Sequence, residues 1–295
     1  MASRATNLKM AVSLAALLLS SATCRSEGID TEHMFGFTIG SDVGETGEME
    51  IQARTTGRFG KQSGTYSAAS QELALEIVPV PDFRAEFGAV LAFHNINGVI
   101  GLEDRRQAGF QGASLDLRYR FLDRRTATFG LTLAGETHAD RLDEVSGERV
   151  RKYGTDLALA FDKELIPDRL VAALNVLYQP EWTQSVVAGA VQQEATVGLA
   201  TAVMMQLKPG VFLGGEARYL RKYEGLALDS FVGHALFVGP TVFIRLSERS
   251  RLTLAWSAQV AGRTEVAGRS SPESGSLDVV NFERHQARLQ FGVSF

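Results

Sequence analysis

Apolar and polar residues alternate along most of the chain after residue 47. Residues 83–94, 114–121 and 251–260 each carry apolar side chains at every second position, with mostly polar or small residues between them. Because successive side chains of a β-strand point to opposite faces, this pattern predicts strands with one apolar and one polar face. These segments lack the three- and four-residue spacing of an amphipathic helix.

Turn signals rich in Pro, Gly, Asp and Ser recur at nearly even spacing between the alternating segments. They begin at positions 79, 123, 167, 209 and 248, which are 44, 44, 42 and 39 residues apart. Two strand-like segments joined by a longer polar loop lie between each pair of turns. The pattern predicts twelve strands, near 48–58, 66–78, 83–94, 109–121, 127–138, 150–163, 170–182, 194–207, 211–222, 234–246, 251–263 and 284–295.

The alternation of short turns with longer loops indicates the architecture. A transmembrane strand needs about 9–11 residues, and membrane barrels have short periplasmic turns and longer external loops. We therefore predict an all-β, antiparallel transmembrane barrel over residues 48–295. The alternatives are a soluble sandwich and a β-propeller, although a propeller blade has four short strands where this repeat has two long ones.

Composition excludes several other classes of protein. The chain has 295 residues, of which 45% are hydrophobic and 22% charged, with a net charge of −4. These values do not fit a disordered tail or a helical membrane bundle. They also give no broad basic surface for nucleic acid. One cysteine excludes a disulfide framework and any Cys-based zinc cluster.

The first residues have the organisation of a secretory signal peptide. Arg4 and Lys9 precede the apolar run Met10–Leu19, and small residues follow at 20–23. The run is too short to span a bilayer as a helix, which needs about 20 residues. We therefore predict a signal peptide at residues 1–24 and export through the inner membrane.

Cys24 lies where the signal peptide is expected to end. A lipidated cysteine normally follows Leu, a small residue and then Gly or Ala, whereas Ser21-Ala22-Thr23 precede this one. The sequence leaves two outcomes open, lipidation of Cys24 or its removal with the signal peptide. Removal would leave a mature chain without cysteine, which suits an oxidising compartment.

A Gly-rich, acidic segment, residues 25–47, precedes the first predicted strand and is expected on the periplasmic side. It is either a plug or rim element, with Phe35 and Phe37 packed against the barrel mouth, or a linker left by signal cleavage. Three acidic residues in and after it could bind calcium but lack a defined ligand spacing: Asp42, Glu45 and Glu48. We therefore predict no metal site there.

The last predicted strand ends in Phe295, with Leu289, Phe291 and Val293 at alternate positions before it. This ending resembles the assembly signal of Gram-negative outer-membrane β-barrel proteins of the porin-like kind. The resemblance covers the last strand specifically and the other strands only in pattern; an ordinary edge strand is the alternative. It implies an outer-membrane location, contact with lipid and lipopolysaccharide, and insertion by the barrel-assembly machinery. We expect a monomer.

In such a barrel the apolar face of each strand contacts lipid and the polar face lines the lumen. Seven acidic and six basic residues are thereby predicted to face inward: Glu72, Glu76, Arg84, Glu86, Asp116, Arg118, Arg120, Glu136, Asp156, Glu216, Arg218, Arg245 and Arg288. They could line a narrow, passive channel for small hydrophilic solutes. The alternative is a paired salt-bridge network that closes the lumen, as in a structural or ligand-binding barrel.

Enzymatic chemistry has little support in the sequence. An outer-membrane lipid hydrolase needs a Ser–His pair, and the one candidate pair, Ser67 and His285, is expected about 10 Å apart, too far for a hydrogen bond. Neither a nucleotide-binding motif nor a metal-ligand spacing of histidines occurs. We therefore predict no catalytic activity and no cofactor.

A third class of function is an adhesive barrel whose loops bind a partner. The predicted loop 264–283, which includes Ser270–Gly275, is long and polar. Loops of this kind are often merely solvated or fold partly into the lumen.

Overall fold

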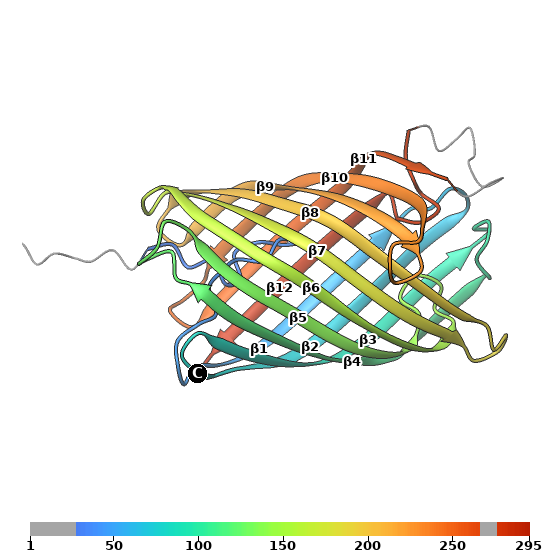
Figure 1. Ribbon diagram of the computed structural model, residues 1–295, viewed down its shortest axis with the longest axis horizontal. Coiled ribbons are helices and arrows are strands. Elements are labelled where there is room, and N and C mark those ends of the chain that lie inside the picture. The colour runs from blue at the N-terminus through green and yellow to red at the C-terminus, as the bar shows by residue number, and fades with distance from the viewer. Residues whose placement is uncertain (1–27, 266–275) are drawn as a thin grey trace, which may run out of the picture.

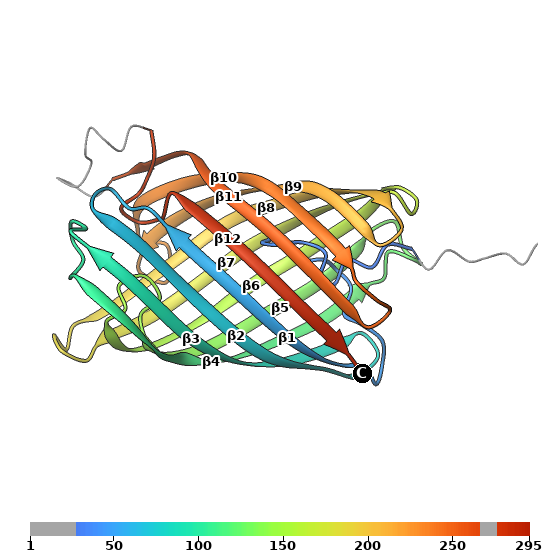
Figure 2. The ribbon, with the colours of Figure 1, turned by 180° about the vertical axis from the view of Figure 1, so that it is seen from behind.

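The computed structural model describes residues 28–265 and 276–295, which form a closed antiparallel barrel (Figures 1 and 2). This confirms the predicted fold class and excludes the propeller and the sandwich. The twelve strands are β1 (Met49–Phe59), β2 (Thr65–Val80), β3 (Phe83–Asn97), β4 (Arg105–Leu122), β5 (Gly130–Leu142), β6 (Arg149–Ile166), β7 (Leu170–Ser185), β8 (Val191–Lys208), β9 (Val211–Glu224), β10 (Ser230–Arg245), β11 (Ser250–Thr264) and β12 (His285–Ser294). In the described part of the chain, no helix has the length and apolar character to cross a membrane.

Several strands extend beyond their predicted bounds, mainly where the long connections join them. β4 begins at Arg105 instead of 109, β10 begins at Ser230 instead of 234, and β5 continues to Leu142 instead of 138. At the start of β4, residues 105–107 are all polar, so the apolar alternation stops while the backbone pairing with β3 continues. At its other end β5 is shorter than predicted, because it begins at Gly130 instead of 127.

The barrel closes where the first strand meets the last. β1 pairs with β12 from Glu50↔Ser294 to Phe59↔His285, and the Phe295 amide donates to the Met49 carbonyl at 2.9 Å. The side chains of the predicted assembly signal, Leu289, Phe291, Val293 and Phe295, lie on the outside and are 37–60% exposed.

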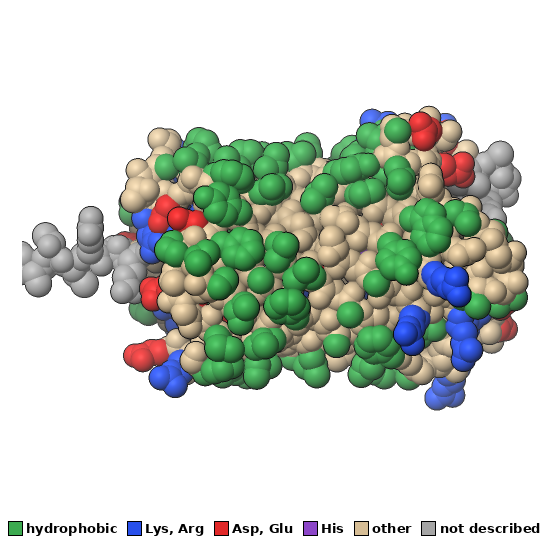
Figure 3. Space-filling model, turned by 60° about the horizontal axis from the view of Figure 1, so that its bottom comes forward, with side chains coloured by type: hydrophobic (Ala, Val, Ile, Leu, Met, Phe, Trp, Pro, Cys, Tyr) green, Lys and Arg blue, Asp and Glu red, His purple; other side chains and the backbone are tan. Residues whose placement is uncertain are grey.

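The wall is apolar outside and charged inside. On β3, Phe87 and Leu91 are 53% and 45% exposed, whereas Arg84 and Glu86 are 1% and 3% exposed. Figure 3 shows apolar side chains covering the outside of the strands, with charged side chains gathered toward the two ends. This is the reverse of a water-soluble protein and fits a wall that contacts hydrocarbon.

The two ends of the barrel differ. The short connections and the C-terminus lie at one end, which we call the turn end, and the longer connections lie at the other, the loop end (Figure 1). Asp82 and Asp168 have positive φ values of 62° and 55° in two of the tight turns. Asp tolerates this left-handed conformation better than most residues, which explains the Pro-Asp turn signals.

Residues 28–47, which we call the plug, run inside the turn-end half of the barrel (Figure 1). Ile29, Met34 and Phe35 are buried in one apolar cluster with side chains of β7 to β10: Val171, Ala173, Ala202, Met204, Phe212 and Phe243. Of the two interpretations of the N-terminal segment, the position of residues 28–47 fits a plug and not a linker outside the barrel. The predicted signal peptide, Cys24 and Ser270–Gly275 lie outside the described residues.

A second segment, residues 276–284, also folds inward and is called the inner loop. Its Phe282 packs against Leu220 and Phe237, and Asp278 is fully buried. The Gln259 amide donates to the Asp278 carbonyl at 3.0 Å, and its oxygen accepts from the Asp278 amide at 2.6 Å. The inner loop therefore narrows the lumen near the loop end.

Candidate functional site in the lumen

Glu216 on β9 binds the middle of the plug. Its carboxylate accepts the backbone N–H groups of Gly36, Phe37 and Thr38 at 2.6, 2.9 and 2.7 Å. Hydrogen bonds from several backbone N–H groups to one carboxylate are strong and fix the position of both partners. Glu216 is therefore engaged with the plug and is not a free lumen charge.

Asp162 on β6 binds the two ends of the plug segment 31–41. It accepts hydrogen bonds from the Thr31 hydroxyl at 2.6 Å and from the Ser41 amide and hydroxyl at 2.7 Å each. Arg124, in the turn after β4, lies 3.3 Å from Asp162 and 2.6 Å from Asp42. The Asp42 carboxylate therefore belongs to this ionic cluster and not to a calcium site with Glu45 and Glu48.

The barrel wall is shaped to admit the plug. A Cβ atom at Gly130 would lie 1.9 Å from the Ser41 hydroxyl, and one at Gly36 would lie 2.1 Å from Cβ of Ala255. Asn175 on β7 completes the attachment, because its amide group accepts from the Ile39 N–H at 2.6 Å and donates to the Ile39 carbonyl at 2.8 Å. The plug and the wall are thus complementary in shape as well as in polarity.

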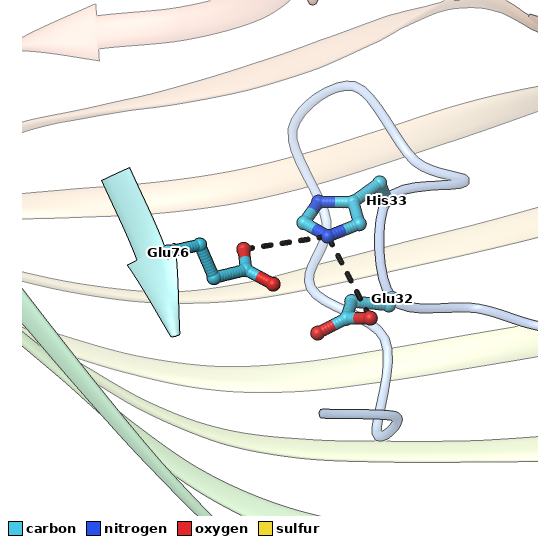
Figure 4. A group of neighbouring side chains, drawn as sticks. All are labelled: Glu32, His33 and Glu76. Atoms are coloured by element: carbon cyan, nitrogen blue, oxygen red, sulfur yellow. Dashed lines mark ion pairs between the residues drawn. The ribbon is translucent and has the colours of Figure 1, made fainter. Parts of the chain in front are cut away.

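A buried ionic network joins the plug to β2 and β3, and Figure 4 shows its Glu32, His33 and Glu76 side chains. Arg84 lies 3.1 Å from both Glu32 and Glu76, and 3.0 Å from Glu86. The His33 ring approaches Glu76 and Glu32, with Nε2 to carboxylate oxygen distances of 3.4 and 3.7 Å.

Beyond the plug the lumen opens into a chamber of about 1030 Å³ that extends to the loop end. Phe37 and Ile39 of the plug form part of its lining at one side, and residues of the inner loop and of the connection 143–148 line it at the other. Seven of the thirteen predicted lumen residues line this chamber: Glu72, Asp116, Arg118, Glu136, Asp156, Arg218 and Arg288.

The other six predicted residues lie elsewhere. Five belong to the plug contacts or to the buried network beside it: Glu76, Arg84, Glu86, Arg120 and Glu216. Arg245 is exposed at the turn end, beside a second cavity of about 100 Å³ that Ile29 and Met34 also line. The plug therefore lies between the two cavities.

Opposite walls of the chamber differ in charge. β9, β12 and β1 supply mainly basic residues, namely Arg218, Lys222, Arg288, Arg54 and Arg58. β5 to β8 supply mainly acidic residues, namely Glu136, Asp140, Asp156, Glu181 and Glu194. Some of these charges pair locally, as Lys152 does with Glu181 at 2.9 Å and Lys222 with Glu194 at 2.7 Å.

Arg218 and Arg288 stand out on the basic wall. Both guanidinium groups lie over the Phe37 ring, at 4.0 and 4.8 Å from its centroid. Neither forms an ion pair with a carboxylate among the described residues; Arg218 is bonded to Gln286 and Arg288 to Thr56 and the Gly36 carbonyl. Their positive charge is therefore directed at the floor of the chamber.

Sequence reasoning missed several residues of the lumen. Arg54 and Lys152 line the chamber, while Asp162 and Asn175 anchor the plug. The signal was present in the alternation: Lys152 and Asp162 have the same parity on β6 as Asp156, which was predicted to face inward. His33 precedes the first strand, where no periodicity could assign it.

The candidate hydrolase pair is kept apart by the register of the barrel. Ser67 on β2 and His285 on β12 both pair with Phe59 of β1, so one complete strand separates them. The His285 ring instead stacks on Trp256. This geometry agrees with the separation expected from the sequence.

The amino-acid sequence matches the model of a known protein family. A model described as "Family of unknown function (DUF6662)" matches residues 27–295. The chain belongs to this family. Among curated proteins, none matches the chain.

Comparison with solved structures gives matches of low sequence identity. The COG4313 outer membrane channel from Pseudomonas putida F1 matches 86% of this chain and 98% of its own, with 12% identity and a TM-score of 0.56. The NanC porin covers 82% and 98% with 13% identity and a TM-score of 0.48. The translocator domain of the autotransporter NalP from Neisseria meningitidis covers 86% and 91% with 12% identity and a TM-score of 0.49. The member of DUF6662 described here therefore shares the fold of an outer-membrane channel.

Proposed function

We propose that this protein is an outer-membrane channel through which small hydrophilic solutes pass passively. The apolar outer wall suits the hydrocarbon core of a bilayer. The fold shared with the Pseudomonas putida channel supports the same location. The observation that carries the proposal is the chamber of about 1030 Å³, because its lining is rich in charged and polar side chains and reaches the loop end.

The charge arrangement favours hydrophilic solutes over apolar ones. A solute in the chamber meets basic groups on the side of Arg218 and Arg288 and acidic groups on the side of Glu136 and Glu181. Opposed charges of this kind orient dipolar solutes and repel neither sign completely. We therefore propose weak selectivity between cations and anions.

The plug favours a second candidate, a closed barrel that binds a ligand in the chamber. Glu216, Asp162 and Asn175 together form hydrogen bonds with eight polar groups of the plug. Solutes would cross the barrel only through a gap beside the plug or after its displacement. The two candidates differ in whether the intact chain conducts ions.

Single-channel recording in planar bilayers tests both candidates. The purified, folded chain and a variant that lacks residues 28–47 are compared, with folding of each checked by the heat-dependent shift of barrels in gel electrophoresis. We expect small or infrequent conductance steps for the intact chain and larger, stable steps for the deletion variant. A folded deletion variant without conductance would refute the channel. A silent intact chain beside a conducting deletion variant would support the closed barrel.

The location and the partners have their own test. We propose that the barrel resides in the outer membrane as a monomer, in contact with lipid and lipopolysaccharide, after insertion by the barrel-assembly machinery. Cell fractionation should recover the protein with outer membranes, with release only by detergent. Recovery from the periplasm in soluble form would contradict this proposal.

A further inference from the structure

His33 is a buried histidine whose inner nitrogen lacks a hydrogen-bond partner. Its side chain is 8% exposed, and Nε2 makes no hydrogen bond to any described residue. The nearest polar atoms are Oε2 of Glu76 at 3.4 Å and Oε2 of Glu32 at 3.7 Å, and all three atoms lie within 4.8 Å of one another (Figure 4). An unsatisfied polar atom in a buried site is costly and requires an explanation.

The two separations from His33 Nε2 are those of metal ligands, and the two carboxylate oxygens lie within 4.8 Å of each other. Nitrogen and oxygen atoms that bind a tetrahedral zinc ion at about 2.0–2.2 Å lie roughly 3.3–3.6 Å from one another. The two distances from His33 Nε2 are close to this range, whereas they are long for direct hydrogen bonds. Two of the ligands come from the plug and the third from β2.

The balance of charges around these three residues also favours the binding of a cation. Five buried carboxylates, from Glu32, Glu72, Glu76, Glu86 and Asp116, are joined by ion pairs to three guanidinium groups, from Arg54, Arg84 and Arg118. Among these buried side chains, five negative and three positive charges leave an excess of two negative charges, and the partly exposed Glu136 adds a further carboxylate 4.0 Å from Arg54. The nearby pair Glu50–Arg251 is balanced in itself. Because uncompensated buried charge is strongly unfavourable, a divalent cation would complete the network.

The groups behind the ligands are placed to orient them. Arg84 Nη1 lies 3.1 Å from Oε1 of Glu32 and 3.1 Å from Oε2 of Glu76, which fixes both carboxylates. The Gln52 side-chain amide lies 3.1 Å from Nδ1 of His33. The structure places the amide nitrogen of Gln52 toward Nδ1. A flip of this amide, which exchanges its nitrogen and oxygen, lets the oxygen accept the Nδ1 proton and leaves the Nε2 lone pair for the metal.

We propose that Glu32, His33 and Glu76 bind one divalent transition-metal ion, with Zn²⁺ as the best match to an imidazole and two carboxylates at tetrahedral spacing. The ion links the plug to β2, through ligands that lie in the chain between Thr31 at the Asp162 anchor and Gly36 at the Glu216 anchor. A metal ion at this site would attach the plug to β2 whether the barrel is open or closed to solutes.

Cobalt titration of the full-length, folded protein in detergent tests the proposal. After removal of metal with a chelator, Co²⁺ should bind at one equivalent and give the visible absorption of tetrahedral cobalt, which Zn²⁺ then abolishes. His33→Ala should lose this absorption. His138→Ala is the matched control, because His138 is another lumen histidine and pairs with Asp140 at 2.8 Å; it should bind Co²⁺ as the parent does.

Glu76→Gln covers the case in which His33→Ala fails to fold. This nearly isosteric change removes one ligand, and a folded variant should bind Co²⁺ at least tenfold more weakly, as loss of a ligand-shell partner typically costs 10–100-fold. At the same concentration, Zn²⁺ should also raise the unfolding temperature of the parent protein by more than that of either variant. Absence of stoichiometric Co²⁺ binding, or equal binding by the parent and a folded variant, would overturn the proposal.

Discussion

The plug half and the chamber half of the lumen use the same kinds of residue for different purposes. In the plug half, Glu216 and Asp162 are saturated by N–H and O–H groups of the plug. In the chamber half, Glu136 and Asp156 face a cavity of about 1030 Å³. An inward carboxylate is therefore structural where a second segment supplies donors, and available to solutes where none does.

The apolar residues show the same contrast. Phe35 is buried among Met34, Met204 and Phe212 as in the core of a soluble domain. Phe37, two residues later, is only partly buried and contacts two guanidinium groups at the chamber floor. The boundary between the two halves therefore lies between these two rings.

The largest expected effect comes from removing the plug anchors. Glu216→Ala and Asp162→Ala should each lower the free energy of unfolding by about 3–5 kcal/mol, because each leaves buried donors or a buried Arg124 without a partner. Urea unfolding in lipid vesicles measures this loss. The controls Glu136→Ala and Asp156→Ala should cost about 1 kcal/mol or less, since their partners lie beside the open chamber. Equal losses at all four sites would remove the distinction between the halves.

A smaller effect should separate the two phenylalanines. Phe35→Ala should lower the free energy of unfolding by about 3–5 kcal/mol because it creates a cavity in a packed cluster. Phe37→Ala should cost less, about 1–2 kcal/mol, because it removes a partly buried ring and its cation–π contacts. The same vesicle unfolding assay compares them; a larger loss for Phe37→Ala would place the boundary elsewhere.

Charge reversal on the basic wall should change ion selectivity. Arg218→Glu replaces a guanidinium that no carboxylate neutralises, so the reversal potential in a KCl gradient should shift toward cations. Arg263→Glu, with a side chain that is 72% exposed at the loop end, is the control and should leave the potential unchanged. An equal shift in both variants would show that overall charge decides selectivity.

The smallest effect is expected at the loop end on acidification. Arg58, 2.8 Å away, lowers the pKa of Glu144 below its ordinary value of 4.5, against the opposite effect of burial. A lowered pKa means that this contact stabilises the connection 143–148 fully above pH 4.5 and is lost as the pH falls through the lowered value. Amide hydrogen exchange in the connection should therefore accelerate only as the pH falls below 4.5. Glu144→Gln should exchange faster already at neutral pH, whereas Glu148→Gln should not.

The sequence was sufficient to predict the barrel but not the division of its lumen. Alternation assigns each strand residue to a face, which is why twelve strands and an inward set including Arg84 and Glu136 could be predicted. The odd or even position of a residue in a strand shows which face its side chain is on. It does not show how far along the barrel axis the side chain lies, or which residue faces it across the lumen. Glu216 and Asp156 therefore looked alike, although one binds the plug and the other lines the chamber.

The plug itself lay beyond the reach of periodicity. Residues 28–47 form neither a helix nor a strand, so their position follows from individual contacts such as Asp162 with Ser41 and Asn175 with Ile39. A short Gly-rich segment of this kind has no local sequence pattern that shows whether it will be buried inside the barrel or exposed outside it. Only the complementary wall, with Gly130 opposite Ser41, reveals it.

The pairing of β1 with β12 has a consequence for biogenesis. As these two strands stand at opposite ends of the barrel sequence, the sheet keeps two bare edges until the final ten residues are added. Bare edges are not tolerated in hydrocarbon, so membrane entry and completion of the cylinder must be coupled. The preceding N-terminal stretch must then be enclosed as the ring shuts, or threaded afterwards through a mouth that is already formed.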